Sequence, residues 1–206
     1  MIRYDSMNEK PVQGIVVVND KGEYKEIYES VNDPLIMRYL SLRNKTTYKT
    51  PALQNRLFRT MRNKLPLAPN LTQPEFIPTK LLLFLDILKD YFPKHRLIIS
   101  DFYKLPDSIQ GVDAPVVQTR HQNTMVPCST YMVNPGWFDI FFPTNFELLK
   151  DIYQLACRSG RAESEKVKVL QHKEFLKRYG DLARTQTKSG ENPMLMYYEN
   201  VKFLLS

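Results

Sequence analysis

The chain has 206 residues, 43% of them hydrophobic and 12% aromatic, and carries a formal net charge of +7. This length and composition suffice for a packed core and exclude intrinsic disorder. No apolar run approaches the roughly 20 residues of a membrane span, and two cysteines give no disulfide framework.

The first predicted elements are a β-hairpin over residues 14–30 and a helix behind it. The β-branched run Gly14–Val18 and the alternating segment Glu23–Tyr28 flank the turn-forming residues Asn19–Gly22. Asp33-Pro34 predicts the start of a helix, because Asp caps helices and Pro suits their first position. The inner face of that helix would carry Leu35, Ile36, Tyr39 and Leu40.

Residues 33–78 are predicted to form a basic helical insertion that ends in an extended, proline-rich connector. No acidic residue lies between Asp33 and Glu75, but eight basic ones do. The apolar residues Leu53, Leu57, Met61 and Leu65 are spaced for one face of a helix, and Arg56, Arg59 and Arg62 for another.

Arg56, Arg59 and Arg62 are candidate partner-binding residues, since a basic helix face attracts an acidic protein or a phosphate. The alternative is an ordinary solvated helix face. Only one aromatic residue, Phe58, lies among these arginines, which is fewer than single-strand binding prefers, so nucleic acid is not the expected partner.

The segment that follows, Leu81–Tyr103, is predicted to be a helix, a corner at Pro93 and a buried strand over Arg96–Ser100. A helix leading into an apolar strand is the repeating unit of an open α/β sheet, in which ligands sit beyond the strand ends. Asp101 and Tyr103 are therefore candidate catalytic residues. Asp101 is equally consistent with a cap or turn residue.

The remaining elements alternate strands with helices, which predicts the α/β class. Residues 79–206 would form one half of the sheet, within a single partial domain over residues 1–206. The predicted strands are Val116–Thr119, Ser129–Val133, Trp137–Phe142 and Val167–Leu170; the predicted helices are Phe146–Ala156 and His172–Tyr179, before a final apolar segment Met194–Leu205.

Several familiar catalytic signatures are absent. The histidines and cysteines have no metal-ligand spacing, and the chain has no nucleophile elbow, no P-loop and no Gly-x-Gly-x-x-Gly. Asn134-Pro135-Gly136 reads as a turn. We therefore predict no metal site and no cofactor-binding residue in this chain.

Three stretches together are similar to one known family. Leu97–Tyr103 resembles the strand ending in Asp-Tyr-Gly of the MidA-like S-adenosylmethionine-dependent methyltransferases. Phe138–Phe146 resembles the family's Asp-Leu-Thr-Ala-Asp-Val-Asp-Phe segment, with Asp139 and Phe146 matching but Pro143 and Asn145 in place of aspartates. His172–Leu176 resembles a late helix start, and Ser189–Met194 suggests the fungal branch.

The resemblance implies the C-terminal part of a Rossmann-like class I methyltransferase sheet with helices on both faces, plus the β-hairpin and the helical insertion. The family's N-terminal half, with its glycine-rich cofactor loop, is missing from this sequence. We therefore expect S-adenosylmethionine in the complete enzyme but not on this chain alone, and an unpaired side on the strand Leu97–Ser100.

The family's mitochondrial members act as protein arginine methyltransferases and complex I assembly factors. The resemblance thus implies a mitochondrial enzyme whose substrate is an arginine of a protein, such as a respiratory complex subunit, although the first residues do not resemble a targeting peptide. A guanidinium held by an acidic group would attack the cofactor's methyl group. Asp101, Tyr103 and Asp139 are the candidates for that cleft. A non-catalytic module that binds a partner protein or RNA through Arg56, Arg59 and Arg62 is the alternative.

Overall fold

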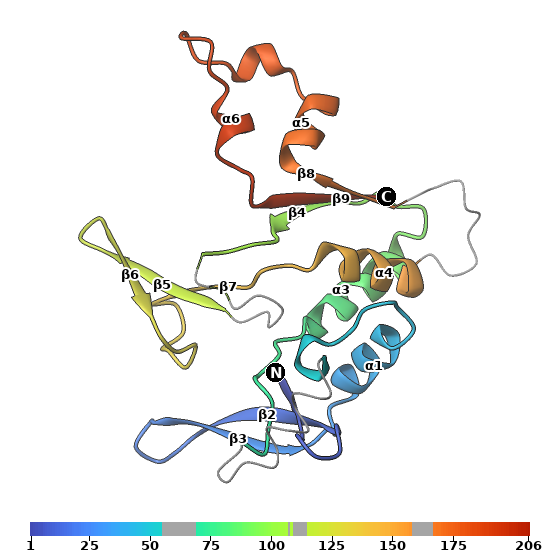
Figure 1. Ribbon diagram of the computed structural model, residues 1–206, viewed down its shortest axis with the longest axis vertical. Helices are drawn as coiled ribbons and strands as arrows, with labels where there is room; N and C mark the ends of the chain where they lie inside the picture. Colours follow the sequence, from blue (N-terminus) through green and yellow to red (C-terminus); the bar gives the residue numbers. More distant parts are fainter. Residues whose placement is uncertain (55–68, 107, 109–114, 158–166) are drawn as a thin grey trace. The chain divides into compact units, whose positions relative to one another are not determined.

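The computed structural model describes residues 1–54, 69–106, 108, 115–157 and 167–206 (Figure 1). They form two compact units, Met1–Leu82 with Asp107–Phe142 and Leu83–Pro106 with Pro143–Ser206. The described strands make three small sheets of three strands each, and every pairing within them is antiparallel. The molecule is thus of mixed α/β class, and a continuous Rossmann-like sheet is not seen among the described strands.

The first unit begins with the predicted hairpin, which is longer than expected. Strands β2 (Pro11–Val18) and β3 (Tyr24–Ser30) pair antiparallel, and β1 (Ile2–Tyr4) adds a third strand alongside β2. Gly22 adopts a φ of 78° in the turn, a conformation that glycine reaches without strain.

Helix α1 (Pro34–Arg43) starts where the sequence predicts. The Asp33 carboxylate accepts hydrogen bonds from the backbone N–H groups of Leu35 (2.7 Å) and Ile36 (3.3 Å), as an N-cap does. The buried face differs from the expected one, because it includes Arg43. A short 3₁₀ turn, η1 (Pro51–Leu53), follows, and most of the predicted Leu53–Leu65 helix lies outside the described residues.

The proline-rich connector is extended, as predicted, and it is bound along β1. Ile2 and Glu75 exchange backbone hydrogen bonds of 2.8 Å in both directions, and Thr72 donates its backbone N–H to the Tyr4 carbonyl (2.9 Å). Ile2, Tyr4 and Ile36 form the core of this unit.

The unit's second sheet corrects one predicted strand. Strands β5 (Val116–His121), β6 (Thr124–Cys128) and β7 (Asp139–Phe141) pair in the order β6-β5-β7. The strand predicted over Ser129–Val133 is wrong, because the chain reverses earlier. Gln122 and Asn123 have φ values of 46° and 62°, which form a tight two-residue hairpin turn.

The second unit is built on the sheet β4-β9-β8, which consists of β4 (Ile98–Phe102), β9 (Val201–Leu205) and β8 (Lys168–Gln171). Since β9 is antiparallel to both neighbours, β4 and β8 run in the same direction. Helix α3 (Thr79–Tyr91) leads into β4, and η2 (Leu182–Thr185) and α6 (Pro193–Met196) lead into β9.

Helices cover both faces of this sheet (Figure 1). On one face, Phe203 of β9 stacks on Phe175 of α5 (His172–Tyr179), with ring centroids 4.0 Å apart. On the other, Tyr153 of α4 (Phe146–Cys157) shares a 2.9 Å hydrogen bond with Ser206. No described helix is long and apolar enough to cross a membrane.

Candidate functional site

The candidate site lies in the second unit, at the edge of the sheet where β4 and β8 end and β9 begins. Because β4 and β8 run in the same direction, their carboxyl ends meet at this edge, which is where α/β sheets place ligands. Strand β4 extends to Phe102 rather than ending at Ser100. The predicted residue Asp101 is therefore the penultimate residue of the strand, and Tyr103 follows it directly.

The Asp101 carboxylate is held in a fixed orientation at this edge. Its Oδ2 accepts a 2.7 Å hydrogen bond from the Thr144 hydroxyl, and its Oδ1 accepts one of 2.8 Å from the Phe102 backbone N–H. Thr144 is itself fixed, since its backbone N–H donates to the Phe102 carbonyl (2.8 Å). Asp101 remains exposed, so the other lone pairs of its carboxylate face solvent.

Tyr103 lies beside Asp101 and carries a cation on its ring. The Lys202 ammonium is 4.6 Å from the centroid of the Tyr103 ring, within the range of a cation–π contact. The Tyr103 backbone N–H donates to the Asn200 carbonyl (3.0 Å), and the Asn200 side chain donates to the Lys104 carbonyl (3.3 Å). These bonds fix the segment after β4 against the start of β9.

His172, the first residue of α5, directly follows β8 at the same edge. Its ring packs against Tyr198 and Phe203, with centroid distances of 5.1 and 5.8 Å. Burial lowers the pKa of His172 below 6.5, and a hydrogen bond with the Met194 backbone opposes part of this shift. The imidazole is thus a neutral packing group at neutral pH, not a charged ligand.

The other predicted site residues belong to other parts of the chain. Asp139 is exposed on β7, opposite Gln118, and belongs to the first unit, whereas Asp101 and Tyr103 belong to the second. Arg56, Arg59 and Arg62 lie outside the described residues. The structure therefore brings Asp101 and Tyr103 together and adds Thr144 and Lys202, which sequence reasoning missed. Thr144 lies far from Asp101 in the chain, and no pattern pairs them.

One basic residue of the insertion has a structural role. Arg43 is 3% exposed, and its guanidinium donates to a Glu75 carboxylate oxygen at 2.7 Å and to the Tyr4 hydroxyl. The positive charge of Arg43 therefore adds little to the potential at the protein surface, because the buried Glu75 carboxylate neutralises it. Burial opposes this charge, but Glu75 and Tyr4 outweigh burial and hold the pKa of Arg43 above its usual value.

A second polar cluster joins the hairpin to the segment after β6. The Glu26 carboxylate accepts hydrogen bonds from the hydroxyls of Tyr28 and Tyr131. Burial would raise the pKa of Glu26, but these two bonds and the nearby Arg3 hold it below 4.5. Burial and the bond to Glu26 raise the pKa of Tyr28 to about 12. These two hydrogen bonds connect parts of the first unit and therefore have a structural role.

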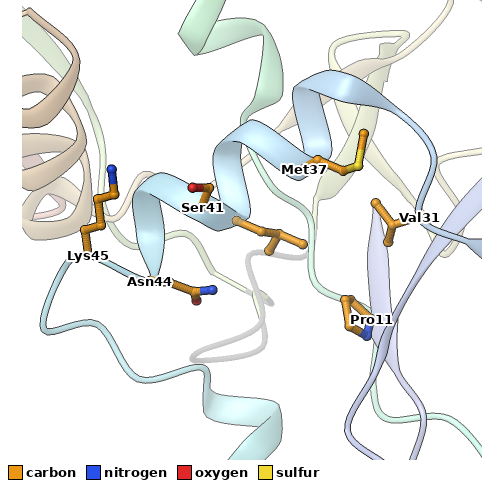
Figure 2. Close-up of a pocket in the computed structure, with 7 residues that line it drawn as sticks. Pro11, Val31, Met37, Ser41, Asn44 and Lys45 are labelled. Carbon is orange, nitrogen blue, oxygen red and sulfur yellow. The ribbon is translucent and has the colours of Figure 1, made fainter.

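The first unit also contains an open hollow of about 580 Å³ beside α1 (Figure 2). Its volume falls in the range of small-molecule sites. Among the described residues that line it, one is charged, the exposed Lys45. The lining residues are Pro11, Val31, Met37, Leu40, Ser41, Asn44 and Lys45.

Within the described part of the chain, no three His, Cys, Asp or Glu side chains are grouped to hold a metal ion. The organisation of the site is that of a sheet edge with an oriented carboxylate and an aromatic ring. Such an edge is typical of α/β proteins that bind a small molecule or a side chain.

Comparison with known proteins identifies the family. Residues 10–162 match the model of the family described as "Putative S-adenosyl-L-methionine-dependent methyltransferase". This match spans well over half of the 206 residues, and the chain belongs to that family. No curated protein matches the chain. The family implies S-adenosylmethionine as the cofactor of the complete enzyme.

The described residues do not fit that cofactor on their own. A nucleotide-type cradle requires glycines between a strand and a helix, so that the backbone can approach the ligand. The described glycines lie elsewhere: Gly22, Gly136 and Gly190 are in turns with open space around them. A Cβ at Gly14 would meet the side chains of Met1 and Tyr28, and one at Gly180 would lie 2.8 Å from the Leu176 carbonyl oxygen. Gly14 therefore allows close packing of the strand, and Gly180 ends helix α5.

Proposed function

We propose that this chain supplies the substrate-binding, C-terminal portion of a mitochondrial, MidA-like protein arginine methyltransferase of the fungal branch. Its substrate is an arginine of a respiratory complex I subunit or of a protein involved in assembling that complex. The family match carries the methyltransferase part of the proposal. The resemblance of Leu97–Tyr103 and Phe138–Phe146 to MidA-like sequences supports the finer assignment.

The geometry of Asp101 supports arginine as the acceptor. A planar guanidinium binds best to a carboxylate that is already oriented, because two parallel N–H···O bonds need both oxygens in place. Thr144 and the Phe102 N–H supply that orientation, and the exposed lone pairs face the place where a side chain can approach. The chain's own contribution is to hold the guanidinium and to limit its rotation.

The open side of β4 supports a second, cofactor-binding part of the sheet. Backbone bonds from Ser206 to Leu97 and from Tyr103 to Asn200 show that the odd-numbered residues of β4 face β9. The backbone groups of Ile98 and Ser100 therefore point to the other side, where no described strand pairs. We place the cofactor-binding half on this side, where a parallel sheet can continue because β4 and β8 run in the same direction.

The test is a methyl-transfer assay on the assembly that forms around this chain in cells. The tagged chain is purified from mitochondria, supplied with radiolabelled S-adenosylmethionine and mitochondrial proteins, and the methylated residue is located by mass spectrometry. The proposal predicts label on arginine, with Asp101→Asn lowering kcat/KM by about 100-fold because a bidentate charge-assisted contact is lost. Label on lysine or glutamine, or equal activity of the variant, would contradict it.

A further inference from the structure

The polar residues at the end of β4 share one face of the sheet. Asp101 and Tyr103 are two residues apart, and the backbone bond from Tyr103 to Asn200 continues the β4–β9 ladder past Phe102, so their side chains point to the same side. Lys202 is directly opposite Asp101 in the register of β4 and β9 and therefore lies on that side as well. The fully buried Leu204 lies on the same face, two residues further along β9 from Lys202. The three polar groups therefore lie between the buried part of this face and the edge of the sheet.

The arrangement of these groups is that of a site for a cation. The Tyr103 ring offers a negative π-face, and the oriented Asp101 carboxylate lies on the same face of the sheet, opposite Lys202 in the strand register. A cation already lies on the ring, since the Lys202 ammonium is 4.6 Å from its centroid. Both oxygens of Asp101 accept hydrogen bonds, which fixes the orientation of the side chain at this edge.

We propose that Asp101 and Tyr103 form a receptor for the guanidinium of an arginine side chain, and that Lys202 occupies this receptor until a substrate displaces it. The inference rests on the proposed function for the identity of the ligand. It adds a specificity device: a lysine ammonium is a compact point charge, whereas a guanidinium is planar, stacks on an aromatic face and binds a carboxylate through two N–H groups. An arginine therefore displaces Lys202, and a substrate lysine gains nothing over it.

The experiment measures binding of acetyl-arginine methylamide to the 206-residue chain by following the Tyr103 ring resonances in NMR titrations. The uncharged isostere acetyl-citrulline methylamide and the lysine analogue serve as ligand controls. Lys202→Met removes the resident cation but keeps the length of the side chain. Lys168→Met is the matched control, because Lys168 is a strand lysine of the same sheet that is exposed and lies opposite Leu205, three residues along β9 from Lys202.

Lys202→Met should bind the arginine derivative about three- to tenfold more tightly than the wild type, the size of effect expected when a competing cation–π contact is removed. Lys168→Met should leave the affinity unchanged, and Asp101→Asn added to Lys202→Met should abolish the gain. Citrulline should not bind. If Lys202→Met fails to fold by circular dichroism, Lys202→Gln replaces it, with the same expectation.

Equal or weaker binding by Lys202→Met, an equal gain in Lys168→Met, or equal binding of citrulline would overturn the proposal. Failure here is distinguishable from failure of the proposed function, because binding is measured without cofactor. If the chain binds the ligands as expected but its assembly does not methylate arginine, the guanidinium receptor is supported and the proposed methyltransferase activity is refuted.

Discussion

Asp101 illustrates how much of a site a sequence can reveal at the scale of single residues. Its place after an apolar run marked it as a strand-end carboxylate, and the structure places it at the end of β4. The alternative, a cap or turn residue, is partly realised too, since its Oδ1 accepts the backbone N–H of the next residue. Its partner Thr144, and Lys202 opposite it on β9, could not be predicted, because they come from segments that only the tertiary structure brings to β4.

Arg43 shows where charge patterning misleads. The sequence groups it with the basic residues of a surface, but it is buried and paired with Glu75. Buried ion pairs depend on a partner distant in sequence, so a local count of charges does not reveal them.

Glu75→Ala should lower the free energy of unfolding of the first unit by about 3–5 kcal/mol, because it leaves the buried Arg43 guanidinium without its counter-charge. Urea denaturation followed by near-ultraviolet circular dichroism measures this. The matched control is Glu147→Ala, which removes an exposed pair with Lys150 of the same 2.7 Å length. The control should cost no more than about 0.5 kcal/mol, and similar losses for both would refute the structural role of Arg43.

His172 makes a prediction about pH. Its folded pKa lies below the 6.5 of the unfolded chain, mainly because of burial, so the unfolded state binds more protons as the pH falls through this range. The stabilisation is complete above pH 6.5 and is lost as the pH falls through the folded pKa. His172→Phe keeps the ring contacts with Tyr198 and Phe203 and should flatten the dependence of stability on pH between about 5 and 7.

The control for this measurement is His121→Gln, because His121 is exposed at the end of β5. Chemical denaturation at a series of pH values should give this variant the wild-type slope. A wild-type slope in His172→Phe would mean that another group causes the pH dependence.

At the scale of elements, local rules worked where the governing residues are adjacent in the chain. Asp33-Pro34 specified the start of α1, and Asn134-Pro135-Gly136 forms the predicted turn, with Gly136 at a φ of 83°. The β5–β6 hairpin was missed because its turn residues, Gln122 and Asn123, include no glycine. Their positive φ values are imposed by pairing of the flanking strands, which outweighs the local preference of Gln.

The β4 strand gives an element-scale prediction about assembly. Ser100→Pro removes an N–H that points away from β9 and leaves the β4–β9 ladder intact, because proline is tolerated on the open side of an edge strand. The chain should therefore fold but lose its association with the proposed cofactor-binding half. Size-exclusion chromatography of the tagged chain with its bound proteins, purified from cells, measures this loss.

Ile99→Pro is the contrasting variant, because the Ile99 backbone faces Leu204 across the ladder. It should destabilise the sheet itself and lower the helical and strand signal in circular dichroism. If Ser100→Pro assembled normally, the open side of β4 would not be the junction proposed here.

At the scale of the whole molecule, the sequence predicts the α/β class of the fold but not the division of the chain into two units. The mixed α/β class and the family membership both follow from segments read in order. The division into two units does not, since the second segment of the first unit returns after β4. The apolar side chains of Leu83, Ile87 and Tyr91 are exposed and, at a spacing of four residues, form a stripe along α3.

The most direct measurement is a calorimetric titration of S-adenosylmethionine into the isolated 206-residue chain and into the proposed assembly, purified from cells through the tagged chain. The account predicts no binding in the micromolar range by the isolated chain, because its described glycines form no cradle, and micromolar binding by the assembly. Micromolar binding by the isolated chain, or none by the assembly, would contradict it.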